Sequence, residues 1–442
     1  MSVVRLRKSI SLFIAVLLAL LLLIIASPLA IPVFAVVPTA ATLHVVGPGG
    51  NIGPNTLCPP VMARGAATFQ TIQKAVDCAL SGDTIEVAAG TYNENVVINK
   101  DLTLLGAQAG VCASDRDGTE NESVIDAGIT PQNYAAIEFT ANYLSVTIDG
   151  FKIIGSRGAV TTKGYDNTGV DLSEFHFLNN IVEANISQYG TSDAALVFVQ
   201  ANVTEIDCND ISPTAIQSPQ TNALRVIFTA SNPPKVDAHY NKLHNASSSG
   251  FGVTGNDNNT CINVTHNEIF GNYDDGIFTY NSCFATLNIT DNSIYSNGKK
   301  GIKFATGIAC NPTVIDINVN CNNIYDNGEE GLYNELGNPM VDAEGNWWGD
   351  DDGSGPFHDP FFVSDSAVAA NAEEIDCEPP DGGDWNCECN SNLDGTGDEI
   401  YADIYDVVGL NVDYCPWYIN ELFEEDDVET ATGTGTAYFE PE

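Results

Sequence analysis

The chain has 442 residues, with 59 acidic and 16 basic side chains and a formal net charge of -43. This charge excludes binding to a nucleic-acid backbone through bulk electrostatics, because the phosphates would be repelled. Hydrophobic residues make up 44% of the chain, so it is not a disordered acidic tail and has enough apolar side chains for a core. The 39 glycines favour many turns and short strands over long helices.

The N-terminal segment predicts export. A basic stretch, Arg5–Lys8, precedes an apolar run, Leu12–Ala26, and small residues at 33–35 suit cleavage. We therefore interpret residues 1–35 as a signal peptide. The alternative is a retained anchor, since the apolar stretch is long enough to span a membrane. In both cases the body is expected to be secreted or held at the cell surface, and an uncleaved anchor is the only membrane contact we expect.

One amphipathic helix is predicted at the start of the exported body. Its apolar residues share one helical face: Phe69, Ile72, Val76, Ala79 and Leu80. Gly82 ends the helix, and a first strand follows from Asp83. A helix of about three turns has the right size to cover the open end of a stack of strands, so we expect an N-terminal helical cap.

A repeat of about 28 residues runs from 151 to 346. Its four clearest copies have a glycine nine residues after their first asparagine, and they begin at Asn241, Asn267, Asn292 and Asn322. Weaker copies begin at Phe151, Asn179, Asn209 and Asn346. A short alternating strand such as Ile262–Thr265 precedes each clear copy, and period-two alternation indicates a strand with one buried face. Such units predict a parallel β-helix with one column of stacked asparagines at 179, 209, 241, 267, 292 and 322.

Several motifs resemble one known group of proteins. They are the run TIQKAVDCALSGDTIEVAAGTYNENVVINKDLTLLGA, the segment TIDGFKIIG, the N-x-I-Y-x-N-x-x-x-G-I units and the closing NWWGDDDGSGP. Together they resemble right-handed parallel β-helix repeat proteins of the pectate-lyase-like superfamily over residues 43–360. The resemblance implies an all-β, right-handed parallel β-helix solenoid. It leaves function open, because the superfamily includes lyases, hydrolases, epimerases and non-catalytic surface proteins.

The candidate catalytic residues come from the register of the repeat. Of the four elements in a polygalacturonase-type signature, only an aspartate pair is present. Three charged pairs occupy equivalent positions in successive copies: Asp274 and Asp275, Lys299 and Lys300, Glu329 and Glu330. Stacking places the basic pair between two acidic pairs. One interpretation is a lysine base whose pKa is set by the flanking carboxylates. The other is a solvated charge ladder that fixes the register of adjacent coils.

The 12 cysteines all follow the signal segment, and an even count in an exported chain indicates disulfides. We expect Cys58 to pair with Cys78 or with Cys112. Three further cysteines precede equivalent strands, and we expect two of them to be joined: Cys261, Cys283 and Cys310.

The C-terminal segment differs in composition from the repeat region. Residues 361–442 contain 22 acidic residues, no Lys or Arg and four cysteines, so we predict a small acidic module. A calcium loop of the EF-hand or dockerin type is predicted within it, with oxygen ligands from Asn392, Asp394, Thr396, Asp398 and Asp403. The loop departs from the pattern by one extra residue and by ending in Asp instead of Glu. Calcium is therefore the one predicted cofactor.

Two functional classes are compatible with these features. The preferred one is a non-catalytic, secreted or cell-surface protein with a glycan-binding or structural role, whose partner is an extracellular polysaccharide or cell-surface glycan. The alternative is a polysaccharide lyase or glycoside hydrolase. The missing signatures, the few arginines and a charge that repels pectin-like polyanions argue against the enzyme.

Overall fold

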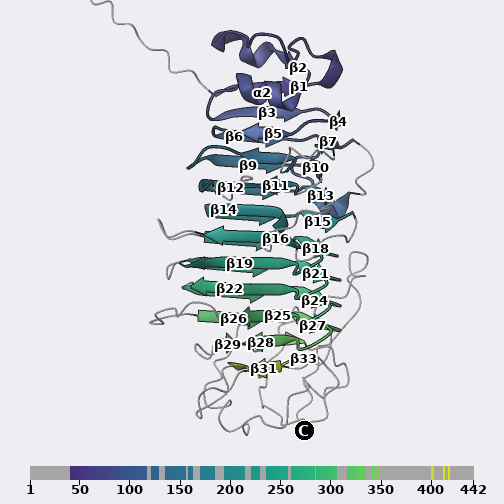
Figure 1. Ribbon diagram of the computed structural model, residues 1–442, viewed down its shortest axis with the longest axis vertical. Helices are drawn as coiled ribbons and strands as arrows, with labels where there is room; N and C mark the ends of the chain where they lie inside the picture. The colour runs from purple at the N-terminus through teal and green to yellow at the C-terminus, as the bar shows by residue number, and fades with distance from the viewer. Residues whose placement is uncertain are drawn as a thin grey trace, which may run out of the picture. The chain divides into compact units, whose positions relative to one another are not determined.

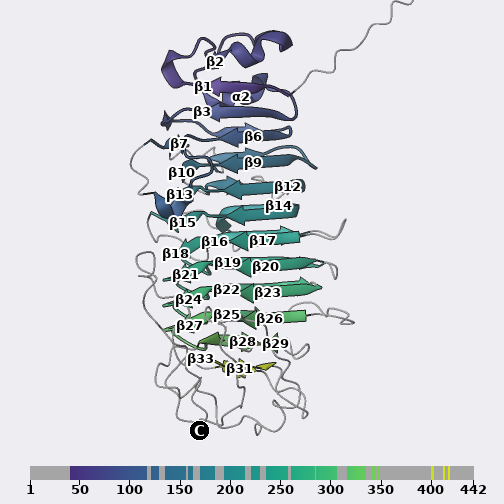
Figure 2. The ribbon, with the colours of Figure 1, turned by 180° about the vertical axis from the view of Figure 1, so that it is seen from behind.

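The structure is a computed structural model of the whole chain (Figures 1 and 2). It describes residues 40–116, 121–128, 135–155, 158–162, 170–184, 194–214, 221–228, 235–256, 260–283, 285–305, 316–334, 341–343, 346–347, 400–402, 412–413 and 417–418. The predicted signal peptide, residues 1–35, lies outside these ranges.

The body is a parallel β-solenoid, in which short strands of successive coils pair in register and form three ladders. Ladder A contains β1 (Thr42–Val45), β3 (Asp83–Val87), β6 (Leu102–Leu105), β9 (Ser145–Asp149), β12 (Leu172–Leu178), the second half of β14 (Ala194–Asp207), β17 (Lys235–His239), β20 (Cys261–Thr265), β23 (Thr286–Thr290), β26 (Asp316–Asn320), β29 (Val341–Asp342) and β32 (Val412–Asp413).

Ladder B is an 11-stranded sheet. It contains β4 (Gly90–Tyr92), β7 (Ser123–Asp126), β10 (Phe151–Gly155), β13 (Ile181–Ala184), β15 (Asp210–Pro213), β18 (Lys242–His244), β21 (Glu268–Phe270), β24 (Ser293–Tyr295), β27 (Asn323–Tyr325), β30 (Asn346–Trp347) and β33 (Trp417–Tyr418). Ladder C contains β5 (Val96–Ile98), β8 (Ile137–Phe139), β11 (Val160–Thr161), the first half of β14, β16 (Thr221–Phe228), β19 (Phe251–Asn256), β22 (Ile277–Cys283), β25 (Ile302–Ala305), β28 (Leu332–Asn334) and β31 (Ile400–Ala402). Because β14 belongs to both, ladders A and C form one 22-stranded sheet together with β2 (Thr68–Phe69), which pairs with β1.

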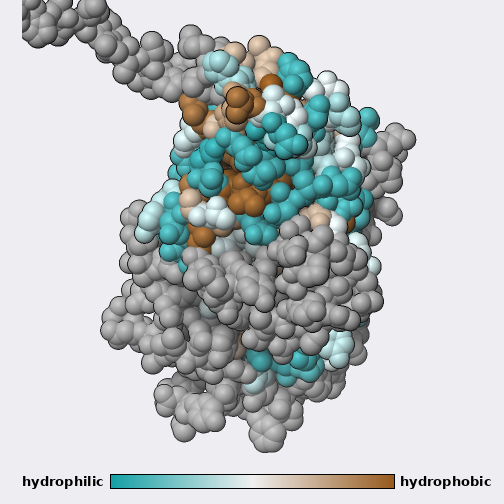
Figure 3. All heavy atoms as spheres, turned by 45° about the horizontal axis from the view of Figure 1, so that its top comes forward, coloured by the Kyte–Doolittle hydropathy of each residue, from teal (hydrophilic) through white to brown (hydrophobic). Residues whose placement is uncertain are grey.

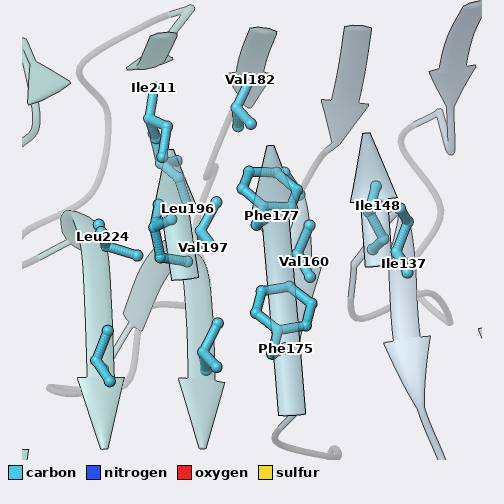
Figure 4. Close-up of a cluster of buried hydrophobic side chains, with 14 of the residues drawn as sticks. Ile137, Ile148, Val160, Phe175, Phe177, Val182, Leu196, Val197, Ile211 and Leu224 are labelled. Carbon is cyan, nitrogen blue, oxygen red and sulfur yellow. The ribbon is translucent and has the colours of Figure 1, made fainter. Parts of the chain in front are cut away.

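Alternate side chains of each strand point into the solenoid and form its core. In ladder A, for example, Ile148, Phe177 and Ile206 are paired neighbours with no solvent exposure. Figure 4 shows such residues from several strands gathered in one cluster. Each side chain of this kind contributes roughly 1.5–3 kcal/mol through its removal from water. The alternation seen in the sequence therefore corresponds to one buried face per strand.

A column of buried asparagines runs along the corner between ladders A and B. Its members are Asn180, Asn209, Asn241, Asn267, Asn292, Asn322 and Asn346. From Asn209 onward, each Oδ1 accepts hydrogen bonds from the backbone N–H and the side-chain amide of the asparagine one coil earlier, as Asn267 does from Asn241 at 2.9 and 3.0 Å. Oδ1 of Asn180 accepts from the backbone N–H of Phe151 at 3.0 Å. The prediction of such a column is confirmed except at its first member. Asn179 lies one residue too early, with a φ of 55° and its amide on Asp149.

A second asparagine column lies at the corner between ladders B and C and explains the glycine of the repeat. Asn272, Asn297 and Asn327 are buried and bond to one another at 2.9 Å. A Cβ on Gly276 would lie 2.9 Å from the amide nitrogen of Asn297 and 2.6 Å from the carbonyl oxygen of Gly301. The side chain of the next asparagine therefore occupies the space that any larger residue would need.

The predicted N-terminal helix is present but shorter than expected. Helix α2 covers Ile72–Cys78, and the side chain of Thr71 caps it by accepting from the N–H of Lys74 at 3.2 Å. Phe69 lies in strand β2 (Thr68–Phe69), which pairs with β1. Three 3-10 helices complete the helical structure of the described residues: η1 (Gly47–Gly49), η2 (Val61–Ala66) and η3 (Ala113–Asp115).

Two disulfides join described residues, Cys58–Cys78 and Cys112–Cys208. The second one fixes a strap, residues 106–116, which crosses successive corners between ladders A and B. The Ala113 N–H donates to the Cys208 carbonyl at 3.0 Å, and Arg116 donates to the Asn179 carbonyl at 2.7 Å. Of the three cysteines expected to contribute one bond, Cys261 is free and exposed.

The described part of the predicted C-terminal module consists of three short strands. These strands, β31, β32 and β33, pair in parallel with β28, β29 and β30. The five predicted calcium ligands lie outside the described residues.

Candidate functional site

The three charged pairs lie in successive turns between ladders B and C. We call this group the charged corner, and it consists of Asp274, Asp275, Lys299, Lys300, Glu329 and Glu330. Backbone hydrogen bonds hold the turns in register, since the Lys299 N–H donates to the Asp274 carbonyl at 2.9 Å. The Glu329 N–H in turn donates to the Lys299 carbonyl at 2.8 Å. The structure therefore brings all six residues together, with the lysines between the acidic pairs.

Each lysine of the charged corner is paired with carboxylates of an adjacent coil. The ammonium of Lys299 lies 2.6 Å from Oδ1 of Asp274, and its side chain is 47% exposed. The ammonium of Lys300 lies 3.0 Å from Oε2 of Glu330 and also contacts Glu329. The side chain of Lys300 is 11% exposed, so its two carboxylate partners replace most of its water shell. The ion pair of Lys299 with Asp274 is solvated and weak, whereas the group of Lys300, Glu329 and Glu330 is largely desolvated.

Lys300 also contacts an aromatic ring. The ammonium of Lys300 lies 4.7 Å from the centroid of the Tyr333 ring. Lys303 lies between Phe278 and Tyr333 in the register of ladder C, with its ammonium 6.0 and 5.5 Å from the two ring centroids. The cations and rings therefore contact each other along the ladder.

The pKa of Lys300 lies above its ordinary value. Burial lowers this pKa, but hydrogen bonds and Coulomb attraction from Glu329 and Glu330 together outweigh the effect of burial. A lysine that acts as a general base at neutral pH needs a lowered pKa, because only its neutral form accepts a proton. The surroundings of Lys300 thus favour the charged form, which suits an ion pair.

Asp275 is the most buried carboxyl of the charged corner, at 6% exposure. Burial raises the pKa of Asp275, and a hydrogen bond from the Lys300 N–H, at 3.2 Å, acts in the opposite direction. A buried carboxyl with a raised pKa is also a common feature of general acids. This residue is therefore the member of the group that an enzymatic role would use.

An aromatic stack on the outside of ladder B was not expected from the sequence. Its rings are those of His244, Phe270, Tyr295 and Tyr325, with centroids 4.9–5.0 Å apart and ring planes within 7° of parallel. Parallel rings at the spacing of neighbouring strands cover one another's faces and turn only their edges outward. Two of the four belong to the N-x-I-Y pattern, so the repeat contained the signal for this stack.

A second aromatic contact lies at the corner between ladders A and B. The rings of Tyr240 and His266 are 4.8 Å apart and tilted by 31°, and Tyr240 is 56% exposed. Both residues directly precede an asparagine of the buried column. His239, by contrast, points its Nδ1 at the Thr265 hydroxyl, 2.5 Å away. His239 and His266 therefore have different partners.

A metal centre is not evident in the part of the chain that the structure describes, where no three His, Cys, Asp or Glu side chains are grouped suitably. The predicted calcium loop lies outside that part and stays a prediction. No helix among the described residues is long and apolar enough to cross a membrane.

The protein is a parallel β-solenoid whose outer faces carry coil-to-coil side-chain ladders. Comparison with protein-family models, with curated proteins and with solved structures gives no match for this chain.

Proposed function

We propose that this chain is an exported, non-catalytic, right-handed β-helix protein of the pectate-lyase-like type, with α2 as the cap of its N-terminal end. Its role is to bind extracellular polysaccharide or cell-surface glycan with the outside of the solenoid. The observation that carries the proposal is the mutual pairing of outward side chains, with Lys300 held between Glu329 and Glu330 as the main example.

This pairing continues on the other outer faces. On ladder A, the amide of Asn288 donates to Asn263 at 2.8 Å, and that of Asn318 donates to Asn288 at 2.9 Å. Side chains that satisfy each other stabilise the stack and hold a surface in a fixed shape. A fixed, polar surface suits binding without chemistry. On the coloured part of the face in Figure 3, hydrophilic residues surround a few hydrophobic areas.

Native affinity electrophoresis tests the binding role. The mature body is run through gels that contain a neutral β-glucan, a galactomannan, dextran or polygalacturonate. The proposal predicts slower migration in at least one neutral gel relative to a gel without polysaccharide. Unchanged migration in every gel would contradict it.

The alternative function, a polysaccharide lyase or hydrolase, is favoured by the buried carboxyl of Asp275 beside Lys300. In that case Asp275 is a proton donor and the lysines, Lys299 and Lys300, position an acidic substrate. The release of unsaturated products or new reducing ends, with loss of that activity in Lys300→Ala, would support this alternative.

Calcium is part of the proposal through the acidic C-terminal segment. A loop with ligands from Asn392, Asp394, Thr396, Asp398 and Asp403 would hold one calcium ion, and the ion would offset part of the self-repulsion of a chain with a net charge of -43.

A further inference from the structure

We propose that Tyr240 and His266 form a stacking site for a neutral hexose ring at the corner between ladders A and B. This inference rests on the proposed glycan-binding function and names the place and the class of sugar. Its first support is the exposure of the ring pair. Tyr240 is 56% exposed although it contacts the His266 ring, so a large part of its side chain remains open to solvent.

The backbone at Tyr240 indicates that the residue is not there for stability. Its φ is 51°, in the left-handed region, where bulky residues are rare. The same corner position has a positive φ in other coils, which have Asn179, Cys208, His266, Asp291 and Cys321 there. Asn, Asp and His are enriched in this conformation, and both cysteines are disulfide-bonded.

Tyrosine at this position has neither advantage, and an exposed ring contributes little to a core. Strained, exposed residues of this kind commonly serve recognition. A tyrosine ring also offers a face of negative potential to the polarised C–H groups of a sugar, and a hydroxyl group at its edge.

The polar side chains beside the ring pair match the hydroxyl groups of a neutral sugar. On the ladder A side, Asp207, His239 and Thr265 occupy successive coils. On the ladder B side, Asp210, Lys242 and Glu268 do so. Three of these side chains are acidic, Asp207, Asp210 and Glu268, and one is a lysine. That lysine, Lys242, is already paired with Glu268 at 3.1 Å. Carboxylates accept hydrogen bonds from hydroxyl groups and repel uronates, so the surroundings favour neutral over acidic sugars.

The aromatic stack of ladder B is less suited to stacking on a sugar ring. Its rings are within 7° of parallel and cover each other's faces, whereas the 31° tilt at the corner opens the contact between Tyr240 and His266. The corner also lies one coil after Cys208, to which the strap is joined by the disulfide and by the Ala113 N–H. The strap thus bounds the proposed site on the side that faces the preceding coil.

The test compares Tyr240→Asn with Tyr273→Asn. Asparagine tolerates the left-handed conformation, so the first variant removes the ring and relieves the backbone. Tyr273 is 68% exposed and lies at the other corner, between ladders B and C, which makes it the matched control. Both variants and the wild type are run by affinity electrophoresis in gels of the neutral polysaccharide that retards the wild type, and each is melted without sugar.

We expect the apparent dissociation constant of Tyr240→Asn to rise about tenfold or more, because aromatic side chains that a ligand covers carry a large share of binding energy. Its melting temperature should equal or exceed that of the wild type, and Tyr273→Asn should bind as the wild type does. Unchanged retention of Tyr240→Asn, or a lowered melting temperature together with weaker retention, would overturn the site and leave the glycan-binding function standing. If the wild type is retained by none of the gels, both proposals fail, and retention by polygalacturonate alone overturns the choice of a neutral sugar.

Discussion

Replacing Asn267 by Ala should destabilise the solenoid far more than replacing Asn263 by Ala. The two asparagines are four residues apart in the same coil. Asn267 points inward and is 2% exposed, whereas Asn263 is on the outside of ladder A. The pair therefore isolates the effect of burial on the same residue type.

The magnitude follows from the hydrogen bonds that each side chain makes. Oδ1 of Asn267 accepts from the backbone N–H of Asn241, and its amide donates to Asn292, Ala238 and Thr265. Truncation leaves the buried N–H of Asn241 without an acceptor, at about 1–3 kcal/mol, and removes the amide–amide bond to Asn292, at about 0.5–1.5 kcal/mol. We expect a loss of roughly 2–4 kcal/mol. At Asn263, water replaces the lost partners, and the loss should be about 0.5 kcal/mol.

Urea denaturation followed by circular dichroism measures the overall change, and hydrogen exchange at the Asn241 amide measures the local one. Exchange at this amide should speed up in Asn267→Ala and stay unchanged in Asn263→Ala. Equal losses of stability in the two variants would refute the assignment of a structural role to the buried column.

Three further outcomes follow from the described contacts and from the predicted calcium loop. Replacing Cys112 and Cys208 by serine should lower the free energy of unfolding by up to about 4–5 kcal/mol, the chain-entropy value for a loop of nearly one hundred residues, and a thermal melt would show it. Because burial raises the pKa of Asp275, its charge opposes folding, and this cost grows as pH rises through the folded-state pKa. Asp275→Asn should therefore stabilise the protein at pH 8 and lose this advantage at low pH, and a variant that is less stable at pH 8 would contradict the reasoning. Calcium should raise the melting temperature relative to chelator at matched ionic strength, and Asp394→Asn should reduce the difference.

The solenoid could be predicted from the sequence because each strand has one buried face. Period-two alternation in segments such as Ile262–Thr265 indicates which side chains point inward. The regular spacing of these segments indicates the length of one coil. The register failed at one point, because Asn179 and Asn180 are adjacent and composition does not distinguish them. The backbone conformation at the corner distinguishes them, since the residue before each column asparagine from Asn180 to Asn322 has a positive φ.

The strap was beyond the reach of the repeat pattern. Cys112 and Cys208 are 96 residues apart, and nothing in their spacing shows that the strap crosses successive coils. Tyr240 and His266 stand at equal positions in adjacent copies, but the repeat pattern does not give the exposure of Tyr240 or the tilt between the two rings. The charged corner was predictable because its pairs are at equal positions in adjacent copies. The pKa of Lys300 was not, because it depends on burial and on the distances to both glutamates.

The central claim, that this solenoid binds glycan without chemistry, is tested most directly by a product assay. The purified mature body is incubated with calcium and with each neutral and acidic polysaccharide, and new reducing ends and ultraviolet-absorbing unsaturated products are followed over time. We predict no product from any polysaccharide, including the one that retards the protein in the gel. Product formation by the wild type that disappears in Lys300→Ala would contradict the claim and identify the charged corner as an active site.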